Sequence, residues 1–413
     1  MNKVIKFAGA QVFSQGKLSQ SEDSFWLDGK MVDKPSGEVV EVNAKGCWLL
    51  PALTALGVDF CEPARDDIYT LKAGFEAMYR GGFYSALLES CYNPIDSIQR
   101  LKAIQSECEK SKLDIRHLAA ISLNYDHQNL SEMLELSQGG AVGFGDGGEL
   151  PADLLFLRRA FDYGSMTQKR FFMQPQEYSL SSKGYVHEGS IADGMGMRAI
   201  PKIAETIAVY ELIELARNTN CPLHLKQITC AESVDLIKQA QKAGLDVTCD
   251  VSVYHLLFDH QILRKLDTNA FVLPPFRESS DKAALWEGLN QGVIQAISLA
   301  HKPVLEQDKL TNYESAVPGA ISLEIAFSAL WERAELYLKD PLADLLKLLT
   351  IGPNKVMAME DSKLNWFLFN PEATVELNKC FFAGQVCNSP LLGQELNGVV
   401  QGTMFNGQWR NAQ

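Results

Sequence analysis

The sequence predicts an α/β fold, namely a (β/α)8 TIM barrel with a small β-sandwich built from both termini. Three observations lead to this prediction. Short apolar runs alternate eight times with longer amphipathic segments through the middle of the chain, and both ends read as short strands separated by turns. No glycine-rich phosphate turn follows the first of the middle strands, which disfavours an open, doubly wound sheet.

The middle of the chain supplies eight strand–helix pairs. The expected strands are 52–60, 82–88, 117–123, 141–145, 170–174, 222–227, 246–251 and 294–299. The expected helices are 67–80, 95–111, 130–138, 151–163, 201–218, 231–243, 280–290 and 319–335, with one more at 340–350. Strict alternation indicates parallel strands joined by crossover helices, and eight such units close a barrel. We therefore expect any chemistry at the carboxyl ends of the strands.

The ends of the chain and two long connections complete the expected organisation. We expect residues 1–51 and 361–413 to form one composite β-sandwich and residues 52–360 to form the barrel. The segments 175–200 and 252–278, which follow the fifth and seventh strands, are unusually long. Connections of that length in a compact domain are usually lids or contact surfaces, so these two are the candidates for partner contacts.

The composition indicates a large buried core and an acidic surface. Hydrophobic residues make up 46% of the 413 residues, and the formal net charge is −13. Such a surface repels phosphate backbones, so nucleic acid is not expected as a partner. The nine cysteines form no CxxC pair and predict neither a disulfide framework nor a zinc finger, which fits the cytoplasm. No apolar stretch reaches the ~18 residues that a membrane helix needs, so no membrane association is expected.

Seven segments resemble, in the same order along nearly the whole chain, the signatures of the dihydroorotases, which belong to the amidohydrolase superfamily. They are LPALTALGVDFCEP (50–63), AVGFGDGG (141–148), EGSIADGMGMRAIPKIAE (188–205), VTCDVSVYHLLF (247–258), VLPPFRESSDKAALWEGLNQGVI (272–294), VPGAISLE (317–324) and CNSPLLGQELNGVV (387–400). The separation from allantoinases and hydantoinases rests mainly on HLLF, PPFR and the C-terminal segment. The resemblance implies a barrel fold and a place in pyrimidine biosynthesis.

The resemblance also implies a metal centre, which this chain does not match. Enzymes of this type use one or two zinc ions, which lower the pKa of bound water to about 7. The ligand and base positions hold Gly57, Asp59, Asp146, Pro175, Gln227 and Ala300. Only the two aspartates are plausible ligands, because glycine, alanine and proline bring no donor atom and a neutral amide oxygen is a poor one. We therefore expect no metal, no cofactor and no catalytic residue.

The positions that would hold the substrate are changed as well. Where the family has an arginine clamp, this chain has Cys61, and two family asparagines are replaced by Cys91 and Leu273. His301 is retained at a position where the family has a histidine near the substrate. The joint loss of metal, base and clamp predicts that the chain is not an enzyme but an inactive dihydroorotase homologue, a pseudoenzyme.

A rebuilt nucleophilic site is a further alternative. Cys61, Cys91 and Cys249 could meet near the mouth and work with His301. The simpler interpretation is that small apolar residues fill a site that no longer needs charge.

The sixth strand offers an internal cation. Lys226 could neutralise Asp59 or Asp146 if it faces the inside of the barrel. Because side chains alternate along a strand, His224, three residues before Gln227, is expected to face the helices instead.

These expectations lead to one main functional hypothesis. The resemblance implies a non-catalytic subunit that assembles with the catalytic subunit of aspartate transcarbamoylase, in a homo- or hetero-oligomer, and supports its activity. The alternative is a divergent active amidohydrolase, a cyclic amide hydrolase with an altered or mononuclear metal site built on Asp59, Asp146, Cys61 and His301. A third hypothesis is a sensor that binds a pyrimidine without reacting.

Overall fold

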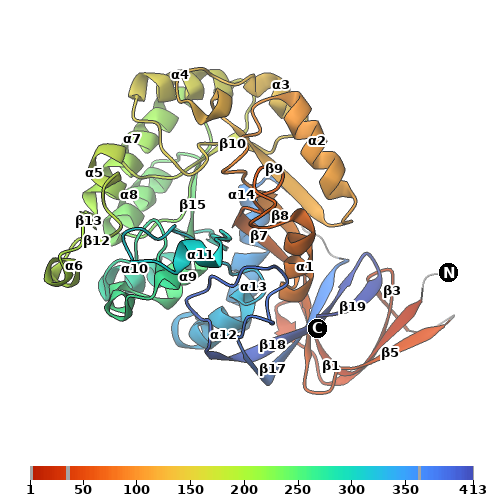
Figure 1. Cartoon of the computed structure of the whole chain (residues 1–413). Helices are drawn as coiled ribbons and strands as arrows, with labels where there is room; N and C mark the ends of the chain where they lie inside the picture. The colour runs from red at the N-terminus through yellow and green to blue at the C-terminus, as the bar shows by residue number, and fades with distance from the viewer. Residues whose placement is uncertain (1–2, 34–37, 361–363, 413) are drawn as a thin grey trace.

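The computed structural model describes residues 3–33, 38–360 and 364–412. In this part of the chain, an eight-stranded parallel sheet and a larger sheet made from the two termini organise the molecule (Figure 1). The predicted fold class, a TIM barrel with a β-sandwich from both ends, is confirmed. The expected boundary at residue 361 lies outside the described residues, as do 1–2, 34–37 and 413 of the expected sandwich, so the division into domains stays a prediction.

The strands of the barrel follow one another in chain order. They are β7 (Leu53–Val58), β8 (Phe83–Leu88), β9 (Asp114–Ala120), β10 (Gly143–Gly145), β11 (Arg170–Met173), β14 (Leu223–Leu225), β15 (Val247–Ser252) and β16 (Ala296–Ser298). A parallel bridge between Val58 and His301 links the end of the sheet back to its beginning. Each of the eight strands expected from the sequence is present.

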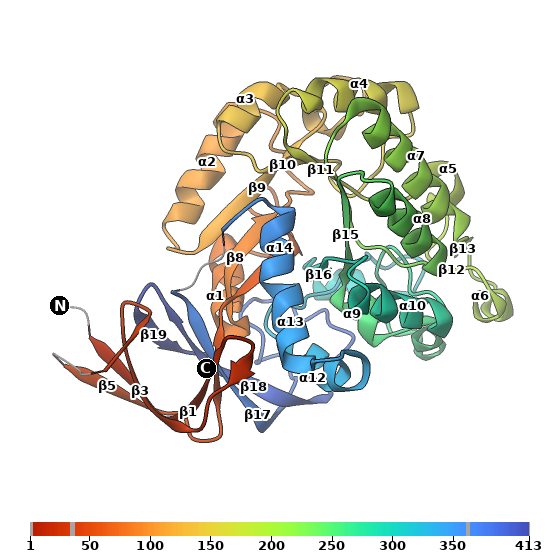
Figure 2. The same cartoon turned by 180° about the vertical axis from the view of Figure 1, so that it is seen from behind.

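Helices form a ring outside the strands (Figure 2). They are α1 (Leu71–Gly81), α2 (Ile98–Glu109), α3 (Met133–Gln138), α4 (Leu154–Ser165), α7 (Ile203–Thr219), α8 (Ala231–Lys242), α10 (Ser279–Asn290), α12 (Ala326–Tyr337), α13 (Pro341–Leu349) and α14 (Ile351–Val356). Helix α12 begins later than the expected residue 319, because Ala320 pairs with His301 in an isolated bridge. Among the described helices, none has both the length and the apolar character that a membrane crossing requires.

Local sequence signals explain where the helices begin and end, as α1 illustrates. The Thr70 side chain accepts a hydrogen bond from the Ala73 backbone N–H at 3.1 Å, which satisfies one of the free donors of the first turn. Gly82 ends the helix in the left-handed region, with φ of 81°, where a glycine has no Cβ penalty. Leu71 and Met78 are buried, so this face of the helix packs onto the barrel.

The amino-terminal half of the barrel interior is filled. Leu56, Leu87, Leu118 and Phe172 are buried together in one cluster, to which Val356 of α14 also belongs. Such layers of inward side chains are usual in TIM barrels and leave space only near the opposite end.

The two termini build one sheet beside the barrel. Its strands are β1 (Val4–Ser14), β2 (Lys17–Leu18), β3 (Glu22–Leu27), β4 (Lys30–Val32), β5 (Val39–Asn43), β6 (Trp48–Pro51), β17 (Trp366–Glu376), β18 (Glu395–Phe405) and β19 (Gln408–Asn411). Figure 1 shows the red N-terminal strands and the blue C-terminal strands side by side. They share a core that includes Phe7, Trp26, Leu49, Leu368 and Met404.

The two long connections carry small elements of their own. The first holds α5 (Tyr178–Ser181), β12 (Val186–His187), α6 (Ser190–Met195) and β13 (Ala199–Ile200), and the second holds α9 (Val253–Leu257), η2 (His260–Lys265) and η3 (Thr268–Ala270). Ile191 and Leu263 meet in one apolar cluster, so the two connections pack against each other.

Candidate functional site

A cavity of about 680 Å³ opens at the carboxyl ends of the barrel strands. Its lining includes Asp59 after β7, Glu89 after β8, Asp146 after β10 and Lys226 after β14. Most of the positions that the sequence analysis singled out lie here too: Gly57, Cys91, Gln227, Leu273, Ala300 and His301 line the same cavity. The cavity therefore stands where barrel enzymes place their chemistry.

The centre of the mouth is an ion-pair triad. The Lys226 ammonium lies 2.6 Å from Glu89 Oε1 and 3.0 Å from Asp146 Oδ1, and all three side chains are largely or fully buried. Burial alone would lower the pKa of Lys226, but the charges of Asp146 and Glu89 outweigh it and hold the pKa above its usual value. Lys226 therefore carries its positive charge at neutral pH.

Two features of this triad bear on the sequence analysis. Pairing of Lys226 with Asp146 was one of the two alternatives left open, and it is the one that the structure shows. Glu89 was missed, although an acidic residue directly after the second strand, in LLES, was the signal that could have revealed it. Burial raises the pKa of Glu89, and Lys226 opposes that rise.

The prediction that His224 faces the helices was wrong. Its Nε2 lies 2.9 Å from Asp250 Oδ2, and its ring packs beside Phe172, whose side chain belongs to the filled interior of the barrel. The parity argument counted back from Gln227, but β14 ends at Leu225 and Gln227 has a φ of 50°. The alternation therefore breaks after Lys226, and His224 and Lys226 both point inward.

Asp59 is a buried carboxylate held by backbone donors. Its Oδ1 accepts a hydrogen bond from the Cys61 N–H at 2.8 Å, and its Oδ2 accepts one from the Cys91 N–H at 3.4 Å. Burial raises the pKa of Asp59, and these hydrogen bonds oppose the rise only in part. Asp59 is thus a group whose protonation can change closer to neutral pH than that of an exposed aspartate.

The cysteines do not form a nucleophilic site. Burial raises the pKa of the Cys61 and Cys91 thiols, so they are protonated at neutral pH. The Cys249 thiol contacts the Val293 carbonyl oxygen at 3.4 Å in the barrel wall, away from the residues that line the cavity. The simpler interpretation of these residues, small apolar fillers, fits this arrangement.

His301 is neutral, and its tautomer can be assigned. Its Nδ1 accepts hydrogen bonds from the Ser322 N–H at 3.0 Å and the Leu323 N–H at 3.3 Å, so the ring proton is on Nε2. Burial lowers the pKa of His301 to about 3. Within the described residues Nε2 has no hydrogen-bond partner, and the ring packs beside Phe60 and Tyr69.

The zinc ions that the resemblance implies do not fit this donor set. Gly57, Pro175 and Ala300 bring no ligand atom, and nowhere in residues 3–33, 38–360 and 364–412 do three histidine, cysteine, aspartate or glutamate side chains gather as a metal site would need. The position between Glu89 and Asp146 is taken by the Lys226 ammonium.

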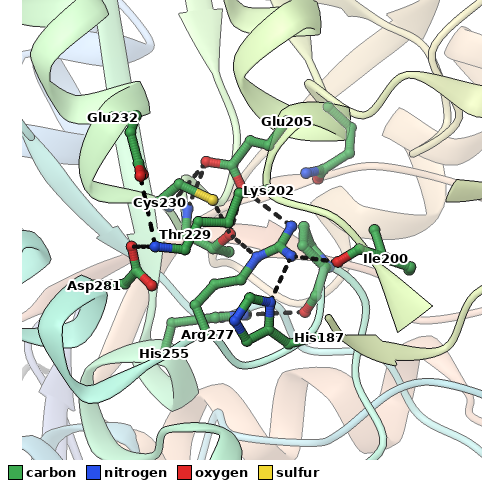
Figure 3. Close-up of polar contacts among 12 residues, drawn as sticks. His187, Ile200, Lys202, Glu205, Thr229, Cys230, Glu232, His255, Arg277 and Asp281 are labelled. Atoms are coloured by element: carbon green, nitrogen blue, oxygen red, sulfur yellow. Dashed lines mark hydrogen bonds and ion pairs between the residues drawn. The ribbon is translucent and has the colours of Figure 1, made fainter. Parts of the chain in front are cut away.

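A second polar network fastens the long connections to the barrel (Figure 3). Arg277, which is buried, donates from Nη1 to the Ile200 carbonyl at 2.8 Å and to His187 Nδ1 at 3.2 Å. Its Nε donates to Thr229 Oγ1 at 3.0 Å, and its Nη2 lies 4.0 Å from Glu205 Oε2. One guanidinium thus ties β13, the loop before α8 and α7 together.

The same network closes around the first turns of α8 and α10. Glu205 Oε1 accepts hydrogen bonds from the Thr229 and Cys230 backbone N–H groups, both at 3.0 Å. Lys202 lies 2.8 Å from Asp281, whose Oδ1 also accepts from the Ala231 N–H at 3.1 Å (Figure 3). Each charge in this network therefore has an opposite charge or a backbone partner.

The C-terminal segment CNSP (387–390) forms a third polar network that connects distant segments. Asn388 Oδ1 accepts from the Val304 N–H at 3.1 Å, and its Nδ2 donates to the Lys302 and Gly319 carbonyl groups, also at 3.1 Å each. This amide holds the wall of the cavity next to His301.

Comparisons with known proteins agree with this architecture. The chain is 31% identical to a dihydroorotase of Carboxydothermus hydrogenoformans, over 98% of this chain and 97% of that protein. It is 30% identical to a dihydroorotase of Pelotomaculum thermopropionicum, over 95% and 94%. The structure of the L-hydantoinase from Arthrobacter aurescens superposes with a TM-score of 0.84 at 17% identity, over 99% of this chain and 95% of that one. No family model matches the chain.

The barrel with its terminal sheet is the fold that this chain shares with the L-hydantoinase. The full-length match at 31% identity is more specific, and the chain belongs to the dihydroorotase family.

These relatives overturn the prediction that the chain is not an enzyme. Proteins that match it along nearly the whole length are dihydroorotases, which points to a hydrolytic, pyrimidine-related amidohydrolase and not to a pseudoenzyme or a non-catalytic subunit. The prediction failed because missing zinc ligands exclude only a zinc-dependent mechanism. It did not consider the other polar groups of the mouth, such as Asp59 and the Lys226 triad.

Proposed function

We propose that the chain acts on a dihydroorotate-type cyclic amide in the cavity at the barrel mouth. The observation that carries the proposal is the cavity itself, which opens at the carboxyl ends of the strands in a chain that matches a dihydroorotase over 97% of that protein. A volume of about 680 Å³ accommodates a single-ring ligand, since ligand pockets span about 300–1,000 Å³.

The polar groups of the mouth suit such a ligand. Lys226 has three N–H donors, and its two carboxylate partners account for two of them. The third is available to a carbonyl oxygen of a bound ring. Lys302 also lines the cavity and brings a second positive charge, which suits a substrate that carries a carboxylate.

Ring opening is the addition of water across an amide. The water oxygen bonds to the carbonyl carbon, the C–N bond breaks, and the leaving nitrogen takes a proton. Asp59 is our candidate for moving that proton, because its burial raises its pKa towards the working pH. The products are a carboxylate and an open-chain ureido group, so no oxidant or reductant is needed.

A turnover assay tests this proposal. Purified protein is offered dihydroorotate, carbamoyl aspartate for the reverse reaction, hydantoin and dihydrouracil, and product formation is followed by chromatography. We expect turnover of at least one compound, and a loss of about 10²–10⁴-fold in kcat for Asp59→Asn.

Two controls make the assay decisive. Asp59→Asn is prepared in the same way as the wild type, so activity that persists unchanged in the variant would refute the role of Asp59. Circular dichroism confirms that both proteins are folded. Folded wild-type protein that turns over none of the four compounds would overturn the proposal.

We also propose that the catalytic subunit of aspartate transcarbamoylase is a partner of this chain, in a homo- or hetero-oligomer. An exposed apolar stripe on α7 supports a protein contact. Ile203, Ile207 and Tyr210 are exposed at spacings of four and three, so they lie on one face of the helix. Tyr178 of α5, in the long segment 175–200, is exposed as well, and α5 contacts α7.

Co-purification followed by mass measurement tests the partnership. We expect a complex with the tagged catalytic subunit that is weakened by Ile207→Glu and Tyr210→Glu. Leu336→Glu, which alters an exposed apolar residue on α12, serves as the matched control and should leave the complex intact. The absence of any complex, or equal weakening by the control, would refute the proposal.

A further inference from the structure

We infer that Lys226 is a built-in cation that occupies the place of a metal ion in the barrel mouth and makes the chain independent of divalent metal. The inference concerns the charge balance of the mouth and not the substrate, so it stands apart from the function proposed above. It rests on the position of one ammonium group between two buried carboxylates.

The triad is part of the barrel architecture. Glu89, Asp146 and Lys226 directly follow β8, β10 and β14, the second, fourth and sixth strands of the barrel. Alternate strands of a TIM barrel contribute their inward side chains to the same layer. The eighth strand, β16, is followed by Ala300, which adds no charge. The layer therefore holds two acidic groups and one basic group, fixed by the strands themselves.

The two carboxylates require a positive charge. The Glu89 side chain is only 12% exposed and that of Asp146 is fully buried, and both contact the same point. Two neighbouring carboxylates cannot both stay ionised at low cost without a cation between them. In a metalloenzyme that cation is the metal, whereas here it is covalently attached to the chain.

The surroundings of Asp146 are arranged for the ammonium. Its Oδ1 accepts from Lys226 Nζ and from the Gly148 N–H at 2.9 Å, and its Oδ2 accepts from the Gln174 N–H at 2.8 Å. The Gln174 amide in turn donates to the Lys226 carbonyl at 3.3 Å. Neighbouring backbone thus fixes the carboxylate and the lysine together.

The same geometry excludes a divalent ion. Zinc lies about 2.0–2.2 Å from carboxylate oxygens, so an ion held by both acids would overlap the ammonium, which would also repel it. In the described part of the chain no third ligand of the histidine, cysteine or acidic type gathers with these two. An ion pair that only stabilises the fold would not stand at a metal position. The test therefore measures metal binding.

Metal binding by lysine variants tests the inference. Wild-type protein from zinc-supplemented cells should contain far less than one equivalent of zinc, and chelator should not change its Tm. Lys226→Met removes the cation at similar side-chain volume. We expect this variant to have a lower Tm, to bind Mn²⁺ at least about tenfold more tightly than the wild type, and to regain Tm when Mn²⁺ is added.

Two further variants make the result specific. Lys302→Met removes another cavity-lining lysine that the triad does not include, and it should gain no Mn²⁺ affinity. Lys226→Met combined with Glu89→Gln removes one of the two acids, and it should lose the gained affinity and recover part of the Tm. Turnover plays no part in these readouts, so they are independent of whether the proposed substrate is correct.

Two outcomes would overturn the inference. One is wild-type protein with a full equivalent of tightly bound zinc, and the other is a folded Lys226→Met variant whose Mn²⁺ affinity equals that of the wild type or of Lys302→Met.

Discussion

The barrel mouth and the Arg277 network stand in opposite relation to the family pattern. In the network, the segments that carry the resemblance provide the working residues: Glu205 comes from the AE pair and Arg277 from PPFR. In the mouth, the family positions hold Gly57 and Ala300, and an ammonium stands between the acids instead of a metal. The Arg277 network thus lies in segments that resemble the family, while the Lys226 triad departs from the family pattern.

This contrast shows that a resemblance in the motifs of the scaffold does not imply a resemblance at the site. A buried guanidinium with four partners holds loops in place whatever reaction the mouth performs. Four predictions test the contrast, beginning with the largest expected effect.

Removal of Arg277 should be the most damaging change. Arg277→Met leaves Glu205 buried without its counter-charge, so we expect the free energy of unfolding to fall by about 3–5 kcal/mol in urea denaturation. Arg264→Met, at an exposed arginine of η2, should change it by less than about 0.5 kcal/mol. If both variants lowered the free energy of unfolding by the same small amount, the network would not hold the long connections in place, and the contrast with the mouth would be refuted.

The network should also shape the dependence of stability on pH. Burial, and then the charge of Arg277, lower the pKa of His187 to about 4 from an ordinary 6.5. Between these values the unfolded chain binds a proton that the folded chain does not, so this contribution to stability is complete above pH 6.5 and is lost as pH falls towards 4.

His187→Asn keeps an acceptor for Arg277 but cannot titrate in this range. The drop in unfolding free energy between pH 6.5 and 4 should be about 3 kcal/mol smaller in the variant than in the wild type. Measurements at pH 7.5, where the imidazole is neutral in both states, give the reference. Parallel pH profiles would count against the assignment.

In the mouth, a small substitution should be moderately harmful. Gly57 has a φ of 66°, and a Cβ built there would meet the Ala300 nitrogen at 3.4 Å, an ordinary contact. The cost of Gly57→Ala therefore comes from the left-handed backbone and should be about 1–2 kcal/mol, seen as a lower Tm. Gly194→Ala in α6, in open space, should not lower the Tm. If Gly57→Ala behaved like this control, the mouth backbone would not be constrained.

The smallest effect concerns the cysteines. Cys380 is exposed, whereas burial raises the pKa of the Cys61 and Cys91 thiols. Iodoacetamide should therefore label Cys380 first, and mass spectrometry should find Cys61 and Cys91 unmodified in folded protein. Cys380→Ser should change the stability by less than about 0.5 kcal/mol. Labelling of Cys91 as fast as Cys380 would reopen a reactive thiol in the mouth.

The fold was more predictable than the site. Alternating apolar runs identified all eight strands, because periodicity is a local property of the sequence. The orientation of His224 was mispredicted, since the strand ends two residues before Gln227 and the alternation does not continue through that loop. The activity was also misjudged, because one chain shows which metal ligands are missing but not which other groups meet in the mouth.

The sequence by itself determined the barrel, the terminal sheet, the residues that stand at the family's zinc-ligand positions and the family itself, all of which depend on local pattern or aligned motifs. The tertiary structure alone decided that Glu89, Asp146 and Lys226 meet. These residues are separated by 57 and 80 positions along the chain, and their contact depends on the closure and stagger of the barrel strands, which no local pattern encodes.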